Sequence, residues 1–426
     1  MALSTQPYKG ARDFYPEDKR LQKYMFNKLR QTVERFGYEE YDAPILEALE
    51  LYTAKTGEEI VNEQTYSFTD RGGRQVVIRP EMTPTVSRMV AAKRQELSYP
   101  VRWYSIPNLW RYERPQRGRL REHWQLNVDI FGITTVAAEL ELIELADAIY
   151  KSFGATPEMY EIRINSRKLM DTALHDYLEL DEPQAHNLAK LIDRMHKLAP
   201  EAFDEQAIAI AGHEKLETVK NLLAASTLAE LPEALRASPA VSGITSVLAQ
   251  LQAAGISNAR FDITIMRGFD YYTDIVFEVA DTDPENNRSM MGGGRYDGLV
   301  GLFGVDPVPT AGFGLGDATL ENFLERHNLL PELRTEIDLA VILIGDVAAA
   351  AQPVIAELRR ACNVMVDISG RKVGDQLKAA DKKGITWALA VGESELTSQQ
   401  FTLKNLKTGQ EQQLALVDIP AALSVA

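Results

Sequence analysis

The order in which segment types follow one another constrains the fold of this chain more than any other feature. Short strand-like pieces dominate the first part, the stretch from about 168 to 255 is helix-rich and alanine-rich, and strand patterns then return. From Ile337 onward strand and helix patterns alternate, which favours a small α/β domain with a largely parallel sheet. Because 426 residues are too many for one ordinary core, we predict two or three domains, with an inserted helical module and a small α/β domain.

Local patterns give the same division in more detail. Apolar residues recur at spacings of three and four between about Pro16 and Phe36, and Gly37 follows, so a helix is expected there. The segments QVVIRP and VRWYSIP are typical of strands, and Ala137 to Phe153 predicts an amphipathic helix. The proline-containing LLPELRTEID indicates a linker before the α/β part.

Composition excludes several classes of protein. The formal net charge of -15 argues against general coating of nucleic acid, so no DNA partner is expected. The single cysteine cannot form an intrachain disulfide, and the six histidines do not fall at metal-ligand spacing, so we expect no metal site built from protein ligands alone. No secretory signal and no apolar stretch of about 20 residues is present, which predicts a cytoplasmic protein without a membrane partner.

One local charge cluster stands out against this acidic background. The segment RYERPQRGRLREHWQ contains five arginines, namely Arg111, Arg114, Arg117, Arg119 and Arg121. Strand patterns flank a Pro- and Gly-containing segment here, so a long hairpin with the arginines near its tip is plausible. Arginine presents a planar fork that matches phosphate oxygens. The alternative is a solvated loop whose arginines pair with surface carboxylates.

The strand that follows carries an unusual polar face. In HWQLNVDIFG the apolar and polar residues alternate strictly, so Gln125, Asn127 and Asp129 share one face of a strand. Polar groups on a buried face cost free energy unless they are paired. A polar ligand bound beside an anion would account for both the arginines and this face.

Two further clusters are candidates for the same site. In MRGFDYYTDIVFEV, Tyr271 and Tyr272 could be ordinary core aromatics, whereas a part-buried Arg267 needs an anion. The glycine runs in MGGGRYDGL and GFGLG match neither the dinucleotide fingerprint nor the GxxxxGK[ST] loop. If ATP binds, it therefore binds through arginine rather than through a glycine cradle.

Taken together, these segments resemble the histidyl-tRNA synthetase family of class II aminoacyl-tRNA synthetases. KGARDFYP is similar to the opening element of the family, and FGYEEYDAPILE, with Pro44, resembles motif 1 at the dimer interface. RYERPQRGRLREHWQLNVDIFG is similar to motif 2, and RGFDYYTDIVFE and GGRYDGL resemble the two histidyl-specific signatures. IDLAVILIG through GRKVGDQLKAADKKG resembles the anticodon-binding domain, so the likeness covers nearly the whole chain.

The resemblance implies an α+β fold with an antiparallel catalytic sheet of six to seven strands flanked by helices. It implies a catalytic domain in 1–167 and 256–330, a helical insertion in 168–255, a linker in 331–336 and an anticodon-binding α/β domain in 337–426. The family acts as a homodimer on histidine, ATP with Mg²⁺ and tRNA(His). Histidine attacks the α-phosphate of ATP to give histidyl-adenylate and pyrophosphate, and the histidyl group then moves to the 3′-terminal adenosine of the tRNA.

The resemblance also assigns roles to individual residues. Arg111 and Arg267 would be catalytic, on opposite sides of the α-phosphate, where two guanidinium groups can spread the charge of the transition state. The histidine-binding residues would be Glu81, Thr83, Gln125, Asp129, Tyr271 and Tyr272. ATP would contact Arg111, Glu113, Arg119 and Arg267, and the tRNA acceptor end would meet Arg114, Gln116 and Arg117.

Two departures from the family pattern leave an alternative open. Asp129 stands where many members have glutamate, and in GFGLGDATL Thr319 stands where the motif 3 arginine is expected, so one ATP contact is absent or comes from elsewhere. Thr319 favours a catalytically silent paralogue such as the regulatory subunit of ATP phosphoribosyltransferase. The C-terminal domain, Arg111, Arg267 and Gln125 favour the active enzyme. A synthetase-like RNA-binding protein without aminoacylation has no positive support in the sequence.

Overall fold

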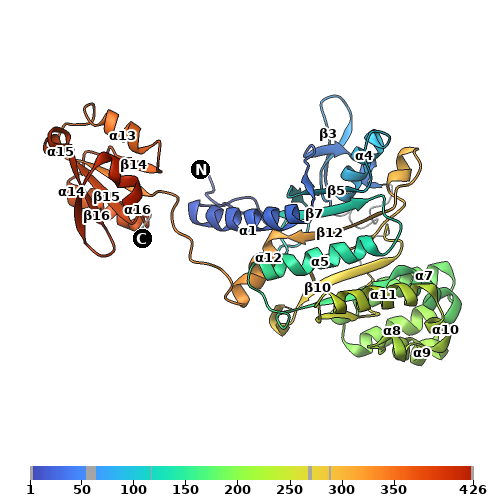
Figure 1. Ribbon diagram of the computed structural model, residues 1–426. Coiled ribbons are helices and arrows are strands. Elements are labelled where there is room, and N and C mark those ends of the chain that lie inside the picture. Colours follow the sequence, from blue (N-terminus) through green and yellow to red (C-terminus); the bar gives the residue numbers. More distant parts are fainter. Residues whose placement is uncertain (1–2, 54–63, 117, 267–270, 287–288, 424–426) are drawn as a thin grey trace. The chain divides into compact units, whose positions relative to one another are not determined.

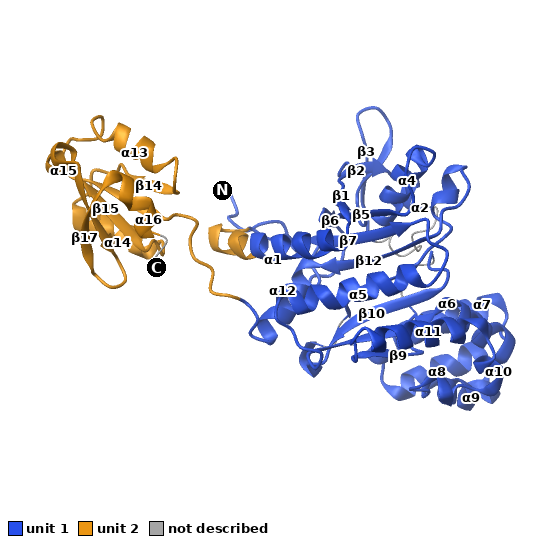
Figure 2. Ribbon diagram, in the orientation of Figure 1, with its two compact units in different colours: residues 1–13, 22–330 blue, residues 14–21, 331–426 orange. Residues whose placement is uncertain are grey.

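The computed structural model describes residues 3–53, 64–116, 118–266, 271–286 and 289–423. The chain forms two compact units, one of residues 1–13 and 22–330 and the other of residues 14–21 and 331–426 (Figure 2). The helices between about 168 and 255 belong to the first unit rather than to a unit of their own. No helix among the described residues is long and apolar enough to cross a membrane.

A nine-stranded sheet, counted over the described residues, organises the first unit (Figure 1). Its strands follow one another in the order β1 (Glu39–Glu40), β5 (Val101–Ser105), β7 (Glu122–Phe131), β12 (Thr310–Gly316), β11 (Ser289–Arg295), β10 (Ile275–Asp281), β8 (Tyr160–Ser166) and β9 (Ala259–Phe261), and β6 (Asn108–Trp110) pairs with β7. The pairs from β5 to β8 are antiparallel, which confirms the antiparallel catalytic sheet. The expected six to seven strands are exceeded because short parallel strands, β1 and β9, extend both edges.

Helices cover the apolar face of this sheet. The α1 helix (Pro16–Arg35) directs Met25 and Leu29 toward Trp124 and Leu126 of β7. The α12 helix (Asp317–Arg326) contacts β7 and β12, while α5 (Ala137–Ser152) contacts β10 and β12 (Figure 1). The polar residues of β7 alternate with Trp124 and Leu126, so they point to the opposite face.

Smaller elements border that opposite face. A three-stranded sheet of β2 (Leu46–Ala48), β4 (Gln75–Ile78) and β3 (Tyr66–Thr69) precedes α4 (Thr83–Lys93), and a short helix, α2 (Glu50–Thr53), lies between β2 and β3 in the chain. In α4, Val86 and Val90 pack with Val101 and Phe131 in one apolar cluster. The first turn of α4 is thereby fixed beside β7.

The helical insertion lies between β8 and β9 in the chain. Its helices are α6 (Arg167–Asp171), the π-helical η1 (Thr172–Tyr177), α7 (Glu182–Asp193), α8 (Pro200–Ala211), α9 (Leu216–Leu223), α10 (Glu233–Arg236) and α11 (Pro239–Ala253). Asp181 caps α7 by accepting a hydrogen bond from the Gln184 main-chain N–H, and Pro200 and Pro239 each stand in the first turn of their helix. The prediction of a helix-rich segment here is confirmed.

The C-terminal unit contains a five-stranded sheet within its described residues. The strand order is β14 (Val364–Asp367), β13 (Leu339–Leu343), β15 (Trp387–Val391), β16 (Gln400–Asn405) and β17 (Glu411–Ala415). The first three strands are parallel as predicted, whereas β16 and β17 are antiparallel. The helices α13 (Gln352–Leu358), α14 (Val373–Lys382), α15 (Glu393–Ser398) and α16 (Ile419–Leu423) accompany it.

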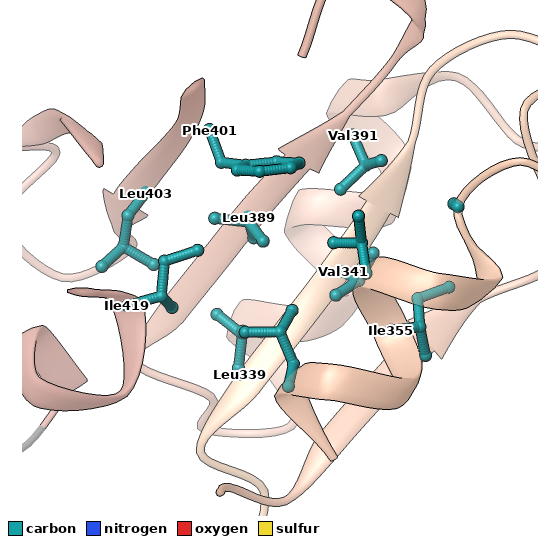
Figure 3. Packing of buried hydrophobic residues seen from close by; sticks show 11 residues of the cluster. Leu339, Val341, Ile355, Leu389, Val391, Phe401, Leu403 and Ile419 are labelled. Atoms are coloured by element: carbon teal, nitrogen blue, oxygen red, sulfur yellow. The ribbon is translucent and has the colours of Figure 1, made fainter. Parts of the chain in front are cut away.

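One apolar cluster holds this second sheet together. Figure 3 shows Phe401 beside Leu389 and Leu403 beside Ile419, in one cluster with Leu339. Each of these side chains is at most 1% exposed. Burial of such a cluster gives the C-terminal unit a hydrophobic core separate from that of the first unit.

Candidate active site

The polar face of β7 lies against glycines of the next strand. Asp129 pairs with Gly312 and Asn127 with Gly314 in the β7–β12 register. A Cβ atom on Gly312 would lie 2.4 Å from Asp129 Oδ1, and one on Gly314 would lie 2.9 Å from Gln125 Cδ. The Asp129 and Gln125 side chains therefore occupy the space that any larger residue on β12 would fill. The evenly spaced glycines of GFGLG make room for this polar row.

Asp129 is a buried carboxylate with one satisfied oxygen. Its side chain is 4% exposed. The Tyr296 hydroxyl donates a hydrogen bond to Oδ1, whereas Oδ2 has no hydrogen-bond partner within the described part of the chain. Burial raises the pKa of Asp129 to about 7, and the Tyr296 hydrogen bond opposes this shift. A buried acceptor of this kind favours a ligand that brings an N–H donor.

Three tyrosines form a group that contacts this carboxylate through the Tyr296 hydroxyl. The Tyr271 ring centroid lies 4.9 Å from that of Tyr272 and 5.5 Å from that of Tyr296. Tyr272 lies over the glycine strand β11, because a Cβ atom on Gly294 would come within 2.9 Å of its Cδ1. Burial raises the pKa of Tyr271 and of Tyr296 well above the ordinary value, so both hydroxyls remain protonated donors.

Glu81 joins the same group from the turn before α4. Its side chain is 3% exposed, and its Oε2 accepts a hydrogen bond of 3.2 Å from the Tyr271 hydroxyl. The Glu81 carbonyl accepts a second bond of 3.2 Å from the Tyr52 hydroxyl. Thr83 is the first residue of α4. The structure thus brings Glu81, Tyr271 and Tyr272 together with the polar side chains of β7, namely Gln125, Asn127 and Asp129, which we call the β7 row. These residues are far apart in the sequence.

The arginine-rich segment is a hairpin, as predicted. The β6 and β7 strands pair antiparallel, and Gln116 and Arg119 form an isolated bridge near the tip. Arg111 lies at the base, where its Nε donates to the Pro80 carbonyl at 2.9 Å. This bond holds Arg111 against Pro80, the residue that precedes Glu81 in the chain.

The other residues of the hairpin differ in their surroundings. Arg119 Nε lies 2.6 Å from Glu113 Oε2, so these two predicted ATP contacts form an ion pair with each other. Arg114 and Gln116 are exposed. Arg117 and Arg267, which were also predicted to be functional, lie outside the described residues.

Two residues of the site escaped the sequence reasoning. Tyr296 stands two positions after Gly294, so strand periodicity could have placed it on the same face. His123 continues the row of Gln125 by the same rule, and its Nδ1 is buried without a hydrogen-bond partner in the described regions. Burial, reinforced by Arg111 and then by Arg12 and Arg119, lowers the pKa of His123 to about 3. Its imidazole is therefore neutral beside the arginines.

The end of β12 explains how Thr319 is accommodated. The Thr319 hydroxyl donates to the Gly316 carbonyl at 2.9 Å, inside the first turn of α12. Nearby, Asp317 accepts a hydrogen bond of 2.5 Å from Arg12 Nη2 and one of 3.1 Å from the Trp124 main-chain N–H. Burial raises the pKa of Asp317, and Arg12 opposes this shift. Thr319 therefore has a role in the helix terminus and adds no positive charge to the site.

No group of three or more His, Cys, Asp or Glu side chains is arranged to hold a metal ion in the regions that the structure describes. The groups that this region offers instead are the Arg111 guanidinium, the glycine strands β11 and β12, and the hairpin. These groups suit an anionic nucleotide, because guanidinium groups match phosphate oxygens and glycine permits close approach of backbone.

Comparisons with known proteins place the chain among enzymes of one kind. The profile of the histidyl-tRNA synthetase family matches residues 10–320, and that of an anticodon binding domain matches residues 338–425. The histidine–tRNA ligase of Leptospira biflexa is 44% identical over 417 residues, which cover 95% of this chain and 94% of the relative. That of Thermoplasma volcanium is 36% identical and covers 98% of both chains.

Solved structures share the fold. A histidyl-tRNA synthetase from Nostoc is similar with a TM-score of 0.82 at 23% identity over 99% of both chains. A Bacillus halodurans protein described as an ATP phosphoribosyltransferase regulatory subunit/histidyl-tRNA synthetase has a TM-score of 0.74 at 23% identity, over 92% of this chain and 99% of that one. With the family profile matching most of the chain, and full-length relatives at 36% and 44% identity, this chain belongs to the histidyl-tRNA synthetase family of class II aminoacyl-tRNA synthetases.

Proposed function

We propose that this histidine–tRNA ligase holds the imidazole of histidine beside β7, in a pocket formed by Asp129 and the three tyrosines. The observation that carries the proposal is the buried Asp129 Oδ2, which has no partner within the described residues. An imidazole has one N–H donor and one acceptor nitrogen in its neutral form. Asp129 would accept the N–H, and the Tyr272 hydroxyl would donate to the other nitrogen.

The α-amino group of histidine would lie toward Glu81 and Thr83. Glu81 is buried and accepts a hydrogen bond from Tyr271, and the negative charge of its carboxylate suits an ammonium group. Gln125 would contact the same amino acid from the β7 row. The carboxylate of histidine would then be directed to the α-phosphorus of ATP, with Arg111 and Arg267 on its two sides.

The chemistry follows from these positions. The histidine carboxylate attacks the α-phosphorus and pyrophosphate leaves; the terminal ribose hydroxyl of the tRNA then attacks the histidyl carbonyl and AMP leaves. Guanidinium groups fixed around the phosphorus stabilise the charge that develops in the transition state. ATP would enter as its magnesium complex, with Mg²⁺ held mainly by phosphate oxygens and neutralising part of their charge. Glu113 and Arg119 would exchange their mutual ion pair for contacts to ATP.

Assembly and tRNA binding complete the proposal. We propose a homodimer formed through the segment around Pro44, and recognition of the acceptor end of tRNA(His) by Arg114, Gln116 and Arg117. The unit of residues 331–426 would bind the anticodon, and its match to an anticodon binding domain supports this role. The same match speaks against a regulatory subunit. The division into a catalytic domain (1–167 and 256–330), a helical insertion (168–255) and an anticodon-binding domain (337–426) stays a prediction. So does a cytoplasmic location.

Histidine-dependent ATP–pyrophosphate exchange tests this function. The wild-type protein should exchange pyrophosphate only when histidine is present. The Arg267→Ala variant should lose exchange far more than it loses histidine affinity, because the guanidinium would act on the transition state. Absence of exchange in the wild type would favour the regulatory alternative, and equal losses of exchange and affinity in the variant would refute the role of Arg267.

A further inference from the structure

Three buried polar atoms without partners belong to residues on the pocket side of the large sheet. They are the Tyr41 hydroxyl, the Ser105 hydroxyl and Asp129 Oδ2, and none of them has a hydrogen-bond partner anywhere in the described ranges. Ser105 is 1% exposed, and the hydroxyl of Tyr41 lies inside although part of that residue is accessible. Buried polar atoms cost free energy unless something pairs with them. The proposed chemistry uses only Asp129.

Strand register brings these residues to one place. β1, β5 and β7 are consecutive strands of the sheet (Figure 2). Asp129 of β7 is opposite Trp103 of β5, and Ser105 follows two positions later on the same face. Tyr41 comes directly after β1, where its main-chain N–H donates to the Tyr104 carbonyl at 2.8 Å, so the parallel register continues and Tyr41 stands beside Ser105. The Tyr41 and Trp103 ring centroids are 5.7 Å apart.

Electrostatic effects agree with this placement. Burial and the negative charge of Asp129 raise the pKa of Tyr41 well above its ordinary value, and the Ser105 hydroxyl lowers it. The Tyr41 hydroxyl therefore stays protonated and can donate a hydrogen bond. Arg79 and Asp42 also act on Tyr41, but they are paired with each other, with Arg79 Nη1 at 3.3 Å from Asp42 Oδ1.

A single water molecule would bridge the three atoms. Buried waters bind where about three otherwise unpaired polar groups meet. Two hydroxyls and one carboxylate oxygen offer such a water both donors and acceptors. Oδ2 of Asp129 has more than one lone pair, so it can accept from this water and from the N–H of a histidine imidazole at the same time.

We propose that Tyr41 and Ser105, bridged by one buried water, hold the ionised Asp129 carboxylate on the side opposite Tyr296 and act as positioning residues for histidine. We call Tyr41 and Ser105 the second donor pair. This inference rests on the proposed function and adds to it two residues that do not touch the substrate. Tyr296 donates to Oδ1 from the β12 side of β7, and the second donor pair would act on Oδ2 from the β5 side. Donors on both oxygens favour the ionised carboxylate, which burial disfavours.

The histidine affinity of Tyr41→Phe tests the proposal. This variant loses only the hydroxyl and keeps the ring against Trp103. Loss of one hydrogen bond to a charged group should move the protonation of Asp129 to higher pH by at least about one pH unit. The ratio of the histidine Kd of the variant to that of the wild type should therefore be about one near pH 9 and at least about tenfold near pH 5.5. Titration calorimetry at several pH values measures this ratio.

Other titratable groups contribute equally to both proteins. Besides Arg79 and Asp42, the titratable side chains around Asp129 and Tyr41 are Tyr38, Glu81, Tyr271, Tyr272 and Tyr296. Helix α4 faces Tyr41 with the apolar side chains of Val86 and Val90. Because these groups and free histidine are common to variant and wild type, their own titration cancels in the ratio.

Two controls belong to the experiment. Tyr150→Phe makes the same chemical change on α5, at a residue that is 0% exposed and whose hydroxyl also lacks a partner in the described ranges. It should bind histidine as the wild type does at every pH. In an Asp129→Asn background, Tyr41→Phe should cause no pH-dependent change, because the group through which it acts no longer titrates. Ser105→Ala in the wild-type background should change the ratio in the same direction as Tyr41→Phe.

Several results would overturn the second donor pair. A loss of affinity that is equal at every pH would mean that Tyr41 contacts histidine directly or only supports the fold. An unchanged Kd in Tyr41→Phe, or a pH-dependent loss that persists in the Asp129→Asn background, would also contradict the proposal. If the wild-type protein exchanges pyrophosphate in the presence of histidine but shows one of these results, only the second donor pair fails. Wild-type protein without exchange would remove the function itself.

Discussion

At the scale of single residues, Asp129 decides how the pocket responds to protons. Burial raises its pKa to about 7, against an ordinary value of 3.8. A carboxyl group with a raised folded-state pKa favours the folded state below its unfolded pKa, and this contribution is lost as the pH rises through about 7. Above that pH the pocket contains a buried anion, and a histidine N–H would compensate for its burial.

Histidine affinity should therefore fall below about pH 7 for two reasons. Asp129 takes up a proton, and free histidine takes up another near its ordinary imidazole pKa of about 6.5. As the pH falls below about 7, the Kd measured by titration calorimetry should rise with about the second power of the proton concentration in the wild type. In Asp129→Asn it should rise with about the first power. The variant should also bind at least about tenfold more weakly at pH 8, since it loses a charge-assisted hydrogen bond. The same pH dependence in both proteins would contradict this role of Asp129.

At the scale of elements, the register between β7 and β12 determines whether the pocket exists. Gly312 is opposite Asp129, and a Cβ atom there would lie 2.4 Å from Oδ1 and 2.7 Å from the Val128 carbonyl. Main-chain atoms cannot move aside as a flexible side chain can. The glycine is therefore required by the neighbouring strand and not by its own turn geometry.

Gly312→Ala should reduce histidine-dependent exchange by about a hundredfold or more, because displacement of catalytic groups by an ångström can have that effect. Gly298→Ala is the matched control, since a Cβ atom at Gly298 would meet no heavy atom within 4 Å. Exchange rates of the two variants at saturating ATP provide the comparison. A Gly312→Ala enzyme as active as Gly298→Ala would show that the two strands do not constrain the pocket in this way.

A buried ion pair connects β11 with α5 behind the pocket. Arg295 donates from Nε to Glu139 Oε1 at 2.6 Å and from Nη2 to Oε2 at 2.7 Å, and the two side chains are 5% and 1% exposed. Arg295 precedes Tyr296, so the pair fixes the strand that carries the hydroxyl bound to Asp129. Removing one partner of such a pair leaves an uncompensated buried charge.

Glu139→Gln should lower the free energy of unfolding by about 3–5 kcal/mol, as expected for loss of one buried partner. Glu96→Gln is a suitable control, because its ion pair with Lys93 is exposed on both sides and should contribute less than about 1 kcal/mol. Urea denaturation, followed through the unfolding transition of the first unit, measures the free energy of unfolding of both variants. Equal midpoints for the two variants would argue that water or another carboxylate, such as Asp297 at 3.3 Å from Arg295 Nη1, compensates the charge of Arg295.

At the scale of the whole molecule, the proposed activation site and the anticodon binding domain fall on different units. The β7 row, Glu81 and the tyrosines all belong to the unit of residues 1–13 and 22–330, whereas the anticodon binding domain matches residues 338–425. Each unit has its own buried clusters. Activation should therefore be separable from recognition of the anticodon.

A chain ending at Leu330 should retain histidine-dependent exchange and lose tRNA charging by about a hundredfold or more, because the second binding module no longer adds its affinity. Thermal unfolding of the shortened chain should first establish that the remaining unit is folded. Parallel loss of exchange and charging in a folded protein would assign the C-terminal unit a structural role in activation.

The sequence by itself determined the features that depend on local periodicity and residue chemistry. Alternation identified the polar face of β7, the arginine-rich hairpin and the strand–helix order of the C-terminal unit, because side-chain direction follows directly from the spacing of residues. Resemblance of whole motifs identified the family. Roles of single residues such as Arg267 stay predictions, since that residue lies outside the described part.

Only the tertiary structure decided which distant residues meet. Tyr296 and Asp129 are separated by 167 positions, and Tyr271 and Glu81 by 190. No local pattern encodes such pairs, because they depend on strand order and register across the sheet. The raised pKa of Asp129 has the same origin: burial is a property of everything packed around a side chain, and the sequence near that side chain does not contain it.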